Sequence, residues 1–329
     1  MPDSRPNVLL LMTDQHRADC FGIESHPVVE TPYLDHLATS GVRFRNAYSA
    51  SPVCIPARRT LMSGQKPATH RVLTNYHAPL NSPTLPGVLS QNGYQTHLVG
   101  KLHLWPERKL YGFQSTDWSD GPNFREDDYR EYLSEHGVNG SDAALGHGMS
   151  HNGWRARPWH LSEHLHFTNW CAERAIRFLE RRDPTMPFFL NVSFFQPHQP
   201  CTPPYYYFQH YLRKELPKPV VGEWARVFDT PPPGLPVDSW RVELPWELMR
   251  QFRAGYFGSI HHIDDQIGRI LKQIPANTII VFVSDHGEML GDHQWIRKRN
   301  AFEASARVPF FIRFPNEMDI EQGTVRQEV

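Results

Sequence analysis

The sequence is poor in cysteine, carries almost no net charge and contains no long apolar run. Its four cysteines, Cys20, Cys54, Cys171 and Cys201, form no Cys-x-x-Cys pair, which argues against a zinc ribbon and against a disulfide framework. The net charge of −1 predicts no electrostatic capture of nucleic acid or of an anionic membrane. No segment approaches the roughly 20 apolar residues that a membrane helix needs. We therefore expect neither a nucleic-acid partner nor a membrane partner, and we expect the cysteines other than Cys54 to be reduced and buried.

The first residues show no secretory signal. Between Met1 and Pro6 there is no charged lead, no apolar core and no small-residue cleavage site. The sequence therefore favours a cytoplasmic protein, with the alternative that a leader has already been removed.

Apolar runs typical of strands alternate along the chain with segments of helical periodicity. Strands are expected at residues 7–12, 94–99, 188–195 and 278–283, and helices at residues 31–41, 84–93, 166–182 and 248–274. This alternation predicts an α/β fold with a mostly parallel, mixed central sheet and helices on both faces, in a single domain over residues 1–329. Residues 112–159 and the proline-rich residues 197–245 are expected to form long loops over the edge of the sheet where ligands bind.

Two of the expected strands end directly in residues that can bind a cation. The first strand leads into Asp14 and Gln15, and the strand at residues 278–283 leads into Asp285 and His286. If the two strands are parallel neighbours, these four side chains converge at the carboxyl edge of the sheet. Three oxygen donors and one imidazole suit a hard divalent cation better than a metal that prefers thiolates.

Cys54 lies where an extended segment gives way to a helix. The segment Cys54-Ile55-Pro56-Ala57-Arg58 opens this helix, which is expected to end near Gly64. Free backbone N–H groups at such a helix start favour an anion of the size of phosphate or sulfate. Taken alone, the segment is better interpreted as a helix start with a buried free thiol.

Six segments in the same order resemble the type I sulfatases of the alkaline-phosphatase superfamily. They are the strand ending in Asp14-Gln15, Cys-x-Pro-x-Arg with Leu-Met-Ser-Gly at residues 61–64, Gly-Lys-x-His at 100–103, Pro-His-x-Pro at 197–200, Ser-Asp-His-Gly at 284–287, and Lys298 followed by Phe-Glu-Ala-Ser-Ala-Arg-Val-Pro at 302–309. Each motif is weak alone, but together they cover nearly the whole chain. The resemblance implies a sulfatase-like catalytic domain, and the smaller C-terminal subdomain of the family is expected to be absent from this chain.

The resemblance also implies a mechanism. A maturation enzyme would convert Cys54 to formylglycine, whose hydrated aldehyde attacks sulfur and then expels sulfate. Arg58 would hydrogen-bond this diol, while Lys101 and Lys298 would hold the sulfate oxygens.

Two histidines and a metal site complete the set that the resemblance implies. His198 would protonate the departing alcohol, and His103 would take the second diol proton. One divalent cation is expected, with Ca²⁺ as the family expectation and Mn²⁺ or Mg²⁺ as alternatives; its implied ligands are Asp14, Gln15, Asp285, His286 and residue 54.

The sequence departs from the commoner family pattern at three positions. Many members carry an acidic residue at the position of Gln15, Asn at that of His286 and Ser at that of Ala57. The first two variants resemble the branch that includes iduronate-type sulfatases and phosphonate monoester hydrolases. We therefore expect a hydrolase of sulfate esters of carbohydrates or other small alcohols. The alternatives are a phosphonate monoester or phosphodiester hydrolase, and a non-catalytic, truncated sulfatase-like protein.

Two further groups of side chains invite a functional interpretation. Trp105, Trp118, Trp154 and Trp159 are candidates for a wall that faces a carbohydrate, with the alternative that they only anchor the loops. The segment at residues 261–265, His-His-Ile-Asp-Asp, contains possible metal donors. It lies inside the longest expected helix, and we therefore expect it to be structural.

Overall fold

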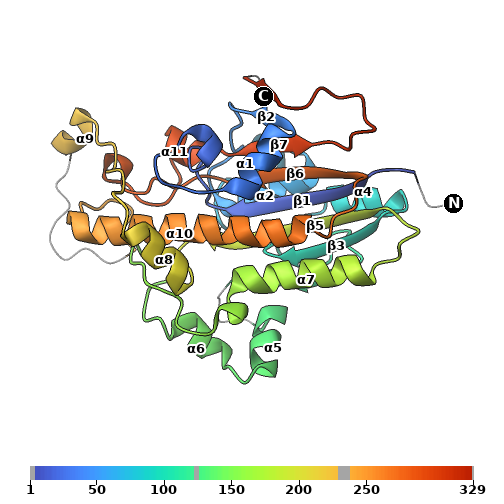
Figure 1. Cartoon of the computed structure of the whole chain (residues 1–329), viewed down its shortest axis with the longest axis horizontal. Helices are drawn as coiled ribbons and strands as arrows, with labels where there is room; N and C mark the ends of the chain where they lie inside the picture. The colour runs from blue at the N-terminus through green and yellow to red at the C-terminus, as the bar shows by residue number, and fades with distance from the viewer. Residues whose placement is uncertain (1–3, 122–125, 229–237, 328–329) are drawn as a thin grey trace.

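The computed structural model describes residues 4–121, 126–228 and 238–327 (Figure 1). In this part of the chain eight strands form one sheet, in the order β4-β3-β5-β1-β6-β7-β2-β8. The strands are β1 (Asn7–Asp14), β2 (Val42–Phe44), β3 (Gln95–Gly100), β4 (Ser115–Trp118), β5 (Phe188–Pro197), β6 (Thr278–Ser284), β7 (Phe310–Arg313) and β8 (Thr324–Arg326). All neighbours pair in parallel except β7, which is antiparallel to β6 and to β2. The expected mostly parallel, mixed sheet is confirmed.

Helices connect these strands. They are α1 (Pro32–Thr39), α2 (Cys54–Ser63), α3 (Pro67–His70), α4 (Leu85–Gln91), α5 (Asp128–Glu135), α6 (Gly140–Leu145), α7 (Phe167–Arg181), α8 (Tyr205–Leu212), α9 (Glu223–Phe228), α10 (Trp246–Leu271) and α11 (Glu303–Ala306), with short 3-10 helices η1 (Gly22–Glu24), η2 (Glu163–Leu165) and η3 (Asp292–Gln294). Within the described residues, no helix combines the length and apolar character that crossing a bilayer requires.

Helices cover both faces of the sheet, as expected. All ten residues of β5 are buried, and at its start successive side chains pack in different cores because successive residues of a strand point to opposite faces. Phe188 and Leu190 pack with residues of α1, α7 and α10, whereas Phe189 packs with residues of α2 and α4. Figure 1 shows the long helices α7 and α10 lying along the sheet.

The expectation of two long loops is corrected in part. Residues 112–159 contain β4, α5 and α6, and residues 197–245 contain α8 and α9. β4 pairs in parallel with β3 at the edge of the sheet, and α8 packs closely on α10 because Gly258 has no side chain. A Cβ at Gly258 would lie 3.1 Å from the backbone of Tyr207. Tertiary contacts therefore order segments that show no local periodicity; residues 122–125 and 229–237 of these segments lie outside the described part of the chain.

The buried His166 predicts a loss of stability in acid. Its Nδ1 accepts the main-chain N–H of Thr168 at 3.1 Å, and its Nε2 donates to the main-chain oxygen of Thr202 at 3.1 Å. Burial lowers the pKa of His166 to about 3, whereas an unfolded histidine titrates near about 6.5. Below that pH the unfolded chain binds a proton that the folded chain does not bind. The free energy of unfolding should therefore fall by about 1.4 kcal/mol per pH unit on account of this residue.

Urea unfolding between about pH 6 and about pH 4.5 measures this effect. The matched variant His166→Asn keeps a side-chain acceptor for the start of α7 but cannot titrate. With acidification, its free energy of unfolding should fall by about 1.4 kcal/mol per pH unit less than that of the unaltered protein. Equal slopes in the two proteins would contradict the prediction.

Candidate active site

The carboxyl ends of β1 and β6 lie together at one edge of the sheet. The two strands are parallel neighbours, and Thr13 is opposite Ser284. Asp14 is the last residue of β1, while Asp285 and His286 directly follow β6. The topology therefore brings together the side chains that the sequence places after two different strands.

These side chains and Cys54 form a compact, buried set of possible metal ligands. One ligand atom from each of Asp14, Cys54, Asp285 and His286 lies within 4.8 Å of all the others. The Nε2 of His286 is 3.7 Å from Asp14 Oδ1 and 3.6 Å from Asp285 Oδ1. Its Nδ1 donates to the main-chain oxygen of Gly287 at 3.0 Å, so Nε2 is the ring nitrogen that faces the set. Two carboxylates and an imidazole fit a divalent cation of the calcium, manganese or magnesium type.

Gln15 links Asp285 to a neighbouring group of polar side chains. Its main-chain N–H donates to Asp285 Oδ1 at 3.1 Å, and its φ of +67° turns the chain at this point. Its side-chain Nε2 donates to Gln199 Oε1 at 2.5 Å and to Glu288, and its Oε1 accepts a hydrogen bond from Lys298. In this structure the amide oxygen predicted to be a ligand therefore contacts Lys298.

Cys54 is the first residue of α2. Val53 precedes it in an extended conformation, with φ −147°, and the helix ends at Gly64 with φ +67°. The thiol is buried, and its Sγ lies 3.1 Å from Nε2 of His286. Burial opposes ionisation of Cys54, but Lys298, Lys101 and His286 outweigh it and hold the pKa of this thiol well below its ordinary value. The surroundings therefore stabilise negative charge at residue 54.

The other cysteines lie apart from this cluster. Cys20, Cys171 and Cys201 are free and buried, as predicted from the sequence. Burial raises the pKa of each of these three thiols well above the ordinary value. Position 54 is thus the one described cysteine whose surroundings favour the charged form.

Lys101 and Arg58 contact the carboxylates of the cluster directly. The Nζ of Lys101 is 2.6 Å from Asp14 Oδ2. Arg58 donates to Asp14 at 3.2 Å, to Asp285 at 2.8 Å and to the hydroxyl of Ser193 at 2.9 Å. Burial and Cys54 favour neutral Asp14, yet Lys101 and Arg58 hold the pKa of Asp14 well below its usual range. The guanidinium expected to contact the nucleophile thus contacts the ligand carboxylates in this structure.

A cavity of about 380 Å³ opens beside Cys54. Lys101, His103, His198 and Lys298, all singled out in the sequence, line it with Cys54. The main-chain N–H of His103 donates to Asp120 at 2.8 Å. Burial and Lys298 lower the pKa of His198 to about 4, so this imidazole is neutral near pH 7 until a bound anion raises its pKa.

Other lining residues escaped the sequence analysis. His151, Asn152, Trp240, Arg297 and Arg299 also line the cavity. His151, Asn152 and Trp240 lie in the two segments expected to be loops, where no local pattern marks them. The positions of Arg297 and Arg299 on either side of Lys298 were a signal that could have identified them.

The hypothesis of a tryptophan wall is wrong for Trp118 and Trp154, and none of its four tryptophans, including Trp105 and Trp159, lines this cavity. Trp118 and Trp154 are buried, with 5% and 7% of their surface exposed, and pack in hydrophobic cores. Trp105 stacks on the ring of His77. Among the described residues that line the cavity, the one tryptophan is Trp240.

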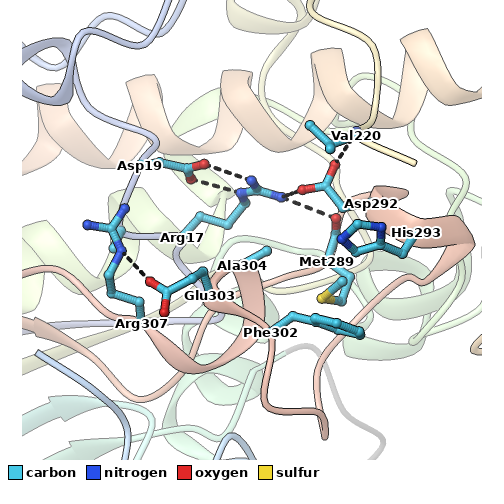
Figure 2. A pocket seen from close by; sticks show the side chains of 11 residues that line it. Arg17, Asp19, Val220, Met289, Asp292, His293, Phe302, Glu303, Ala304 and Arg307 are labelled. Carbon is cyan, nitrogen blue, oxygen red and sulfur yellow. Dashed lines mark hydrogen bonds and ion pairs between the residues drawn. The ribbon is translucent and has the colours of Figure 1, made fainter. Parts of the chain in front are cut away.

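A second cavity, of about 290 Å³, lies beside the segments that follow β1 and β6 (Figure 2). Arg17 crosses it and forms ion pairs with Asp19 at 2.7 Å and with Asp292 at 2.8 Å. It also donates to the main-chain oxygen of Met289 at 3.1 Å. Arg17 therefore ties together the two segments that carry the ligand cluster.

The histidine and aspartate residues inside α10 are structural, as expected. His262 Nε2 is 2.7 Å from Asn169 Oδ1. Asp264 accepts the main-chain N–H groups of Tyr33 at 3.1 Å and Leu34 at 2.7 Å. These bonds satisfy free N–H groups at the start of α1.

A second group of possible ligands is formed by Glu30, His210 and His261. Glu30 accepts hydrogen bonds from His210 at 3.0 Å and from Lys214. Because the ammonium group of Lys214 already compensates the charge of Glu30, we assign no cation to this group.

The chain is similar to known proteins in both sequence and structure. The family model "Sulfatase" matches residues 6–322. The chain is 40% identical to an arylsulfatase of Clostridium perfringens, over 99% of this chain and 72% of that protein. It is 30% identical to a choline-sulfatase of Rhizobium meliloti, over 96% of this chain and 64% of that protein. Among solved structures, the phosphonate monoester hydrolase of Agrobacterium radiobacter superposes with a TM-score of 0.83 at 26% identity, covering 98% of this chain and 71% of that one.

Proposed function

Because this chain belongs to the sulfatase family of the alkaline-phosphatase superfamily, we propose that it hydrolyses the sulfate ester of a carbohydrate or another small alcohol in the pocket beside Cys54. The observation that carries this proposal is the position of Cys54. It lies buried at the start of α2, against Asp14 and His286, in a pocket whose cations stabilise negative charge. Such surroundings suit a residue at which an anionic ester reacts.

We propose that residue 54 acts as formylglycine, whose hydrated aldehyde carries two hydroxyl groups on one carbon. One hydroxyl, reacting as its oxyanion, attacks sulfur while the bond between sulfur and the alcohol oxygen breaks. The departing alcohol takes a proton from His198, whose pKa is raised by the bound anion. The second hydroxyl then gives its proton to His103, the bond between residue 54 and sulfate breaks, and the aldehyde forms again. Addition of water restores the diol.

Two lysines would bind the reacting group. Lys298 and Lys101 both line the pocket with Cys54, so they can contact the sulfate oxygens as charge grows in the transition state. Arg58 would act through the two carboxylates, because its donors hold Asp14 and Asp285 in place. Its contribution is therefore the position of the carboxylates.

Asp14, Asp285, His286 and residue 54 would hold a divalent cation, for which Ca²⁺ is the first candidate and Mn²⁺ or Mg²⁺ the others. A cation bound there supplies positive charge that lowers the pKa of a neighbouring hydroxyl. Lys101 and Arg58 keep both carboxylates oriented for this ligation.

Hydrolysis of phosphonate monoesters is a second candidate function. The solved phosphonate monoester hydrolase matches almost the whole chain, and both ester types present a tetrahedral monoanion. Gln15 and His286, which depart from the commoner family pattern, are compatible with either reaction.

Rates on matched aryl esters separate the two functions. With 4-nitrophenyl sulfate and 4-nitrophenyl phenylphosphonate, we expect a kcat/KM at least about tenfold larger for the sulfate. A larger kcat/KM for the phosphonate would reverse the order of the two functions. The protein should come from its native host, because a host that lacks the maturation enzyme would leave residue 54 as a thiol.

A further inference from the structure

The pocket wall beside Lys298 carries more positive charge than the reacting group requires. Arg297 and Arg299 flank Lys298 in the sequence, and all three line the pocket. Of the described lining residues, Asp120 is the one that bears a carboxylate. The charge of Lys101 is already compensated by Asp14, at 2.6 Å. A sulfate ester brings one negative charge, so the two arginines remain without a function in its hydrolysis.

Trp240 positions both arginines. The centre of its ring lies 4.5 Å from Cζ of Arg297 and 4.9 Å from Cζ of Arg299. The φ angles of these residues are +67° and +80°. Residues other than glycine rarely adopt this conformation, and it is concentrated at functional sites. The backbone thus directs both guanidinium groups to Trp240, while Lys298 between them reaches Gln15.

The two arginines differ in the donors that remain available. Arg297 is buried and donates to the main-chain oxygens of Asn152, at 3.0 Å, and of Asp238. Arg299 is exposed, and its contacts in the described part of the chain are the stacking on Trp240 and a main-chain hydrogen bond to Pro52. Stacking uses the face of a guanidinium and leaves its in-plane N–H groups free. These groups match a carboxylate or a sulfate in two parallel hydrogen bonds.

We propose that Arg299, held on Trp240, binds a second anionic group on the alcohol part of the substrate. The substrates are then sulfate esters that also carry a carboxylate or a second sulfate. This inference rests on the proposed function, since the first anionic group is the ester that reacts at residue 54. The pocket volume of about 380 Å³ fits a single ring with two such substituents.

Paired substrates test the proposal. One is 4-nitrophenyl sulfate, and the others are the same ester with a carboxylate or a sulfonate meta to the sulfate. We expect Arg299→Gln to lower the ratio of kcat/KM for each doubly charged ester to that for singly charged 4-nitrophenyl sulfate by about tenfold. Trp240→Leu should lower the same ratio, because it removes the surface that orients Arg299. Arg269→Gln removes an exposed arginine near the end of α10 and should leave the ratio unchanged.

Equilibrium binding provides a second, independent measurement. Benzene-1,3-disulfonate should bind the protein about tenfold more tightly than benzenesulfonate, and Arg299→Gln should remove this difference. If the aryl sulfates are hydrolysed but Arg299→Gln leaves the kcat/KM ratios unchanged, the inference is overturned and the proposed function stands. If no aryl sulfate is hydrolysed but the binding difference persists, the proposed function fails and the anion site stands. Equal binding of both sulfonates would overturn the anion site.

Discussion

Replacing Cys54 by Ala will abolish sulfate-ester hydrolysis, with a fall in kcat of about 10⁴-fold or more. Alanine supplies neither a thiol nor a precursor of the aldehyde, so no covalent intermediate can form at this position. The cations around residue 54 remain in place and can still bind the substrate. We therefore expect the loss in kcat to be far larger than any change in KM.

A matched control separates this loss from a general effect of removing a thiol. Cys171 is also buried and free, but it lies in the core between α7 and the sheet. Cys171→Ala should keep kcat, although it lowers the free energy of unfolding. Retained hydrolysis in Cys54→Ala would rule out residue 54 as the nucleophile.

Mass spectrometry of the peptide that contains residue 54 tests the modification itself. The aldehyde is lighter than the thiol and reacts with hydrazides. An unmodified thiol in inactive protein from the native host would favour the alternative of a non-catalytic sulfatase-like protein. An unmodified thiol in active protein would instead contradict the formylglycine mechanism.

The sheet could be predicted from the sequence because its central strands are mostly apolar. β1, β5 and β6 are almost entirely buried, so their sequences are near-continuous apolar runs of the kind that buried parallel strands require. The direction of β7 could not be predicted in this way, since an antiparallel strand of four residues carries no local mark of its direction. The helices α5, α6 and α8 were missed because contacts with distant segments stabilise them.

The part of the candidate site that lies at strand ends and at a helix start could be predicted from the sequence. Asp14 and Asp285 follow from the parallel pairing of β1 and β6, and Cys54 follows from the start of α2. The direction of a long side chain depends on its partners, which the sequence does not reveal. The guanidinium of Arg58 therefore contacts two carboxylates. For the same reason the contact between Trp240 and Arg299, more than fifty residues apart, was not foreseen.

Replacing Asp14 by Asn should remove both hydrolysis and the stabilisation of the protein by a divalent cation. Asp14 accepts contacts from Lys101 and Arg58, and its Oδ1 lies in the ligand cluster. The variant keeps the shape of the side chain but leaves two buried cations with less compensating charge, at a cost of about 3–5 kcal/mol. We expect kcat to fall by about 10³-fold, because the site loses a ligand and the position of Lys101.

Calorimetric melting with and without Ca²⁺ measures the second effect. At a Ca²⁺ concentration of 100 times its Kd, the unaltered protein should gain about 2.7 kcal/mol of stability, and Asp14→Asn should lose most of this gain. His286→Gln removes a ligand but leaves the ion pairs of Asp14 with Lys101 and Arg58 in place, so it should fold and should lose the gain as well. Glu30→Gln alters the second group of possible ligands and should melt with the full Ca²⁺-dependent gain. If Glu30→Gln loses the gain while Asp14→Asn keeps it, the cation lies beside Lys214 and the cluster at the ends of β1 and β6 has another purpose.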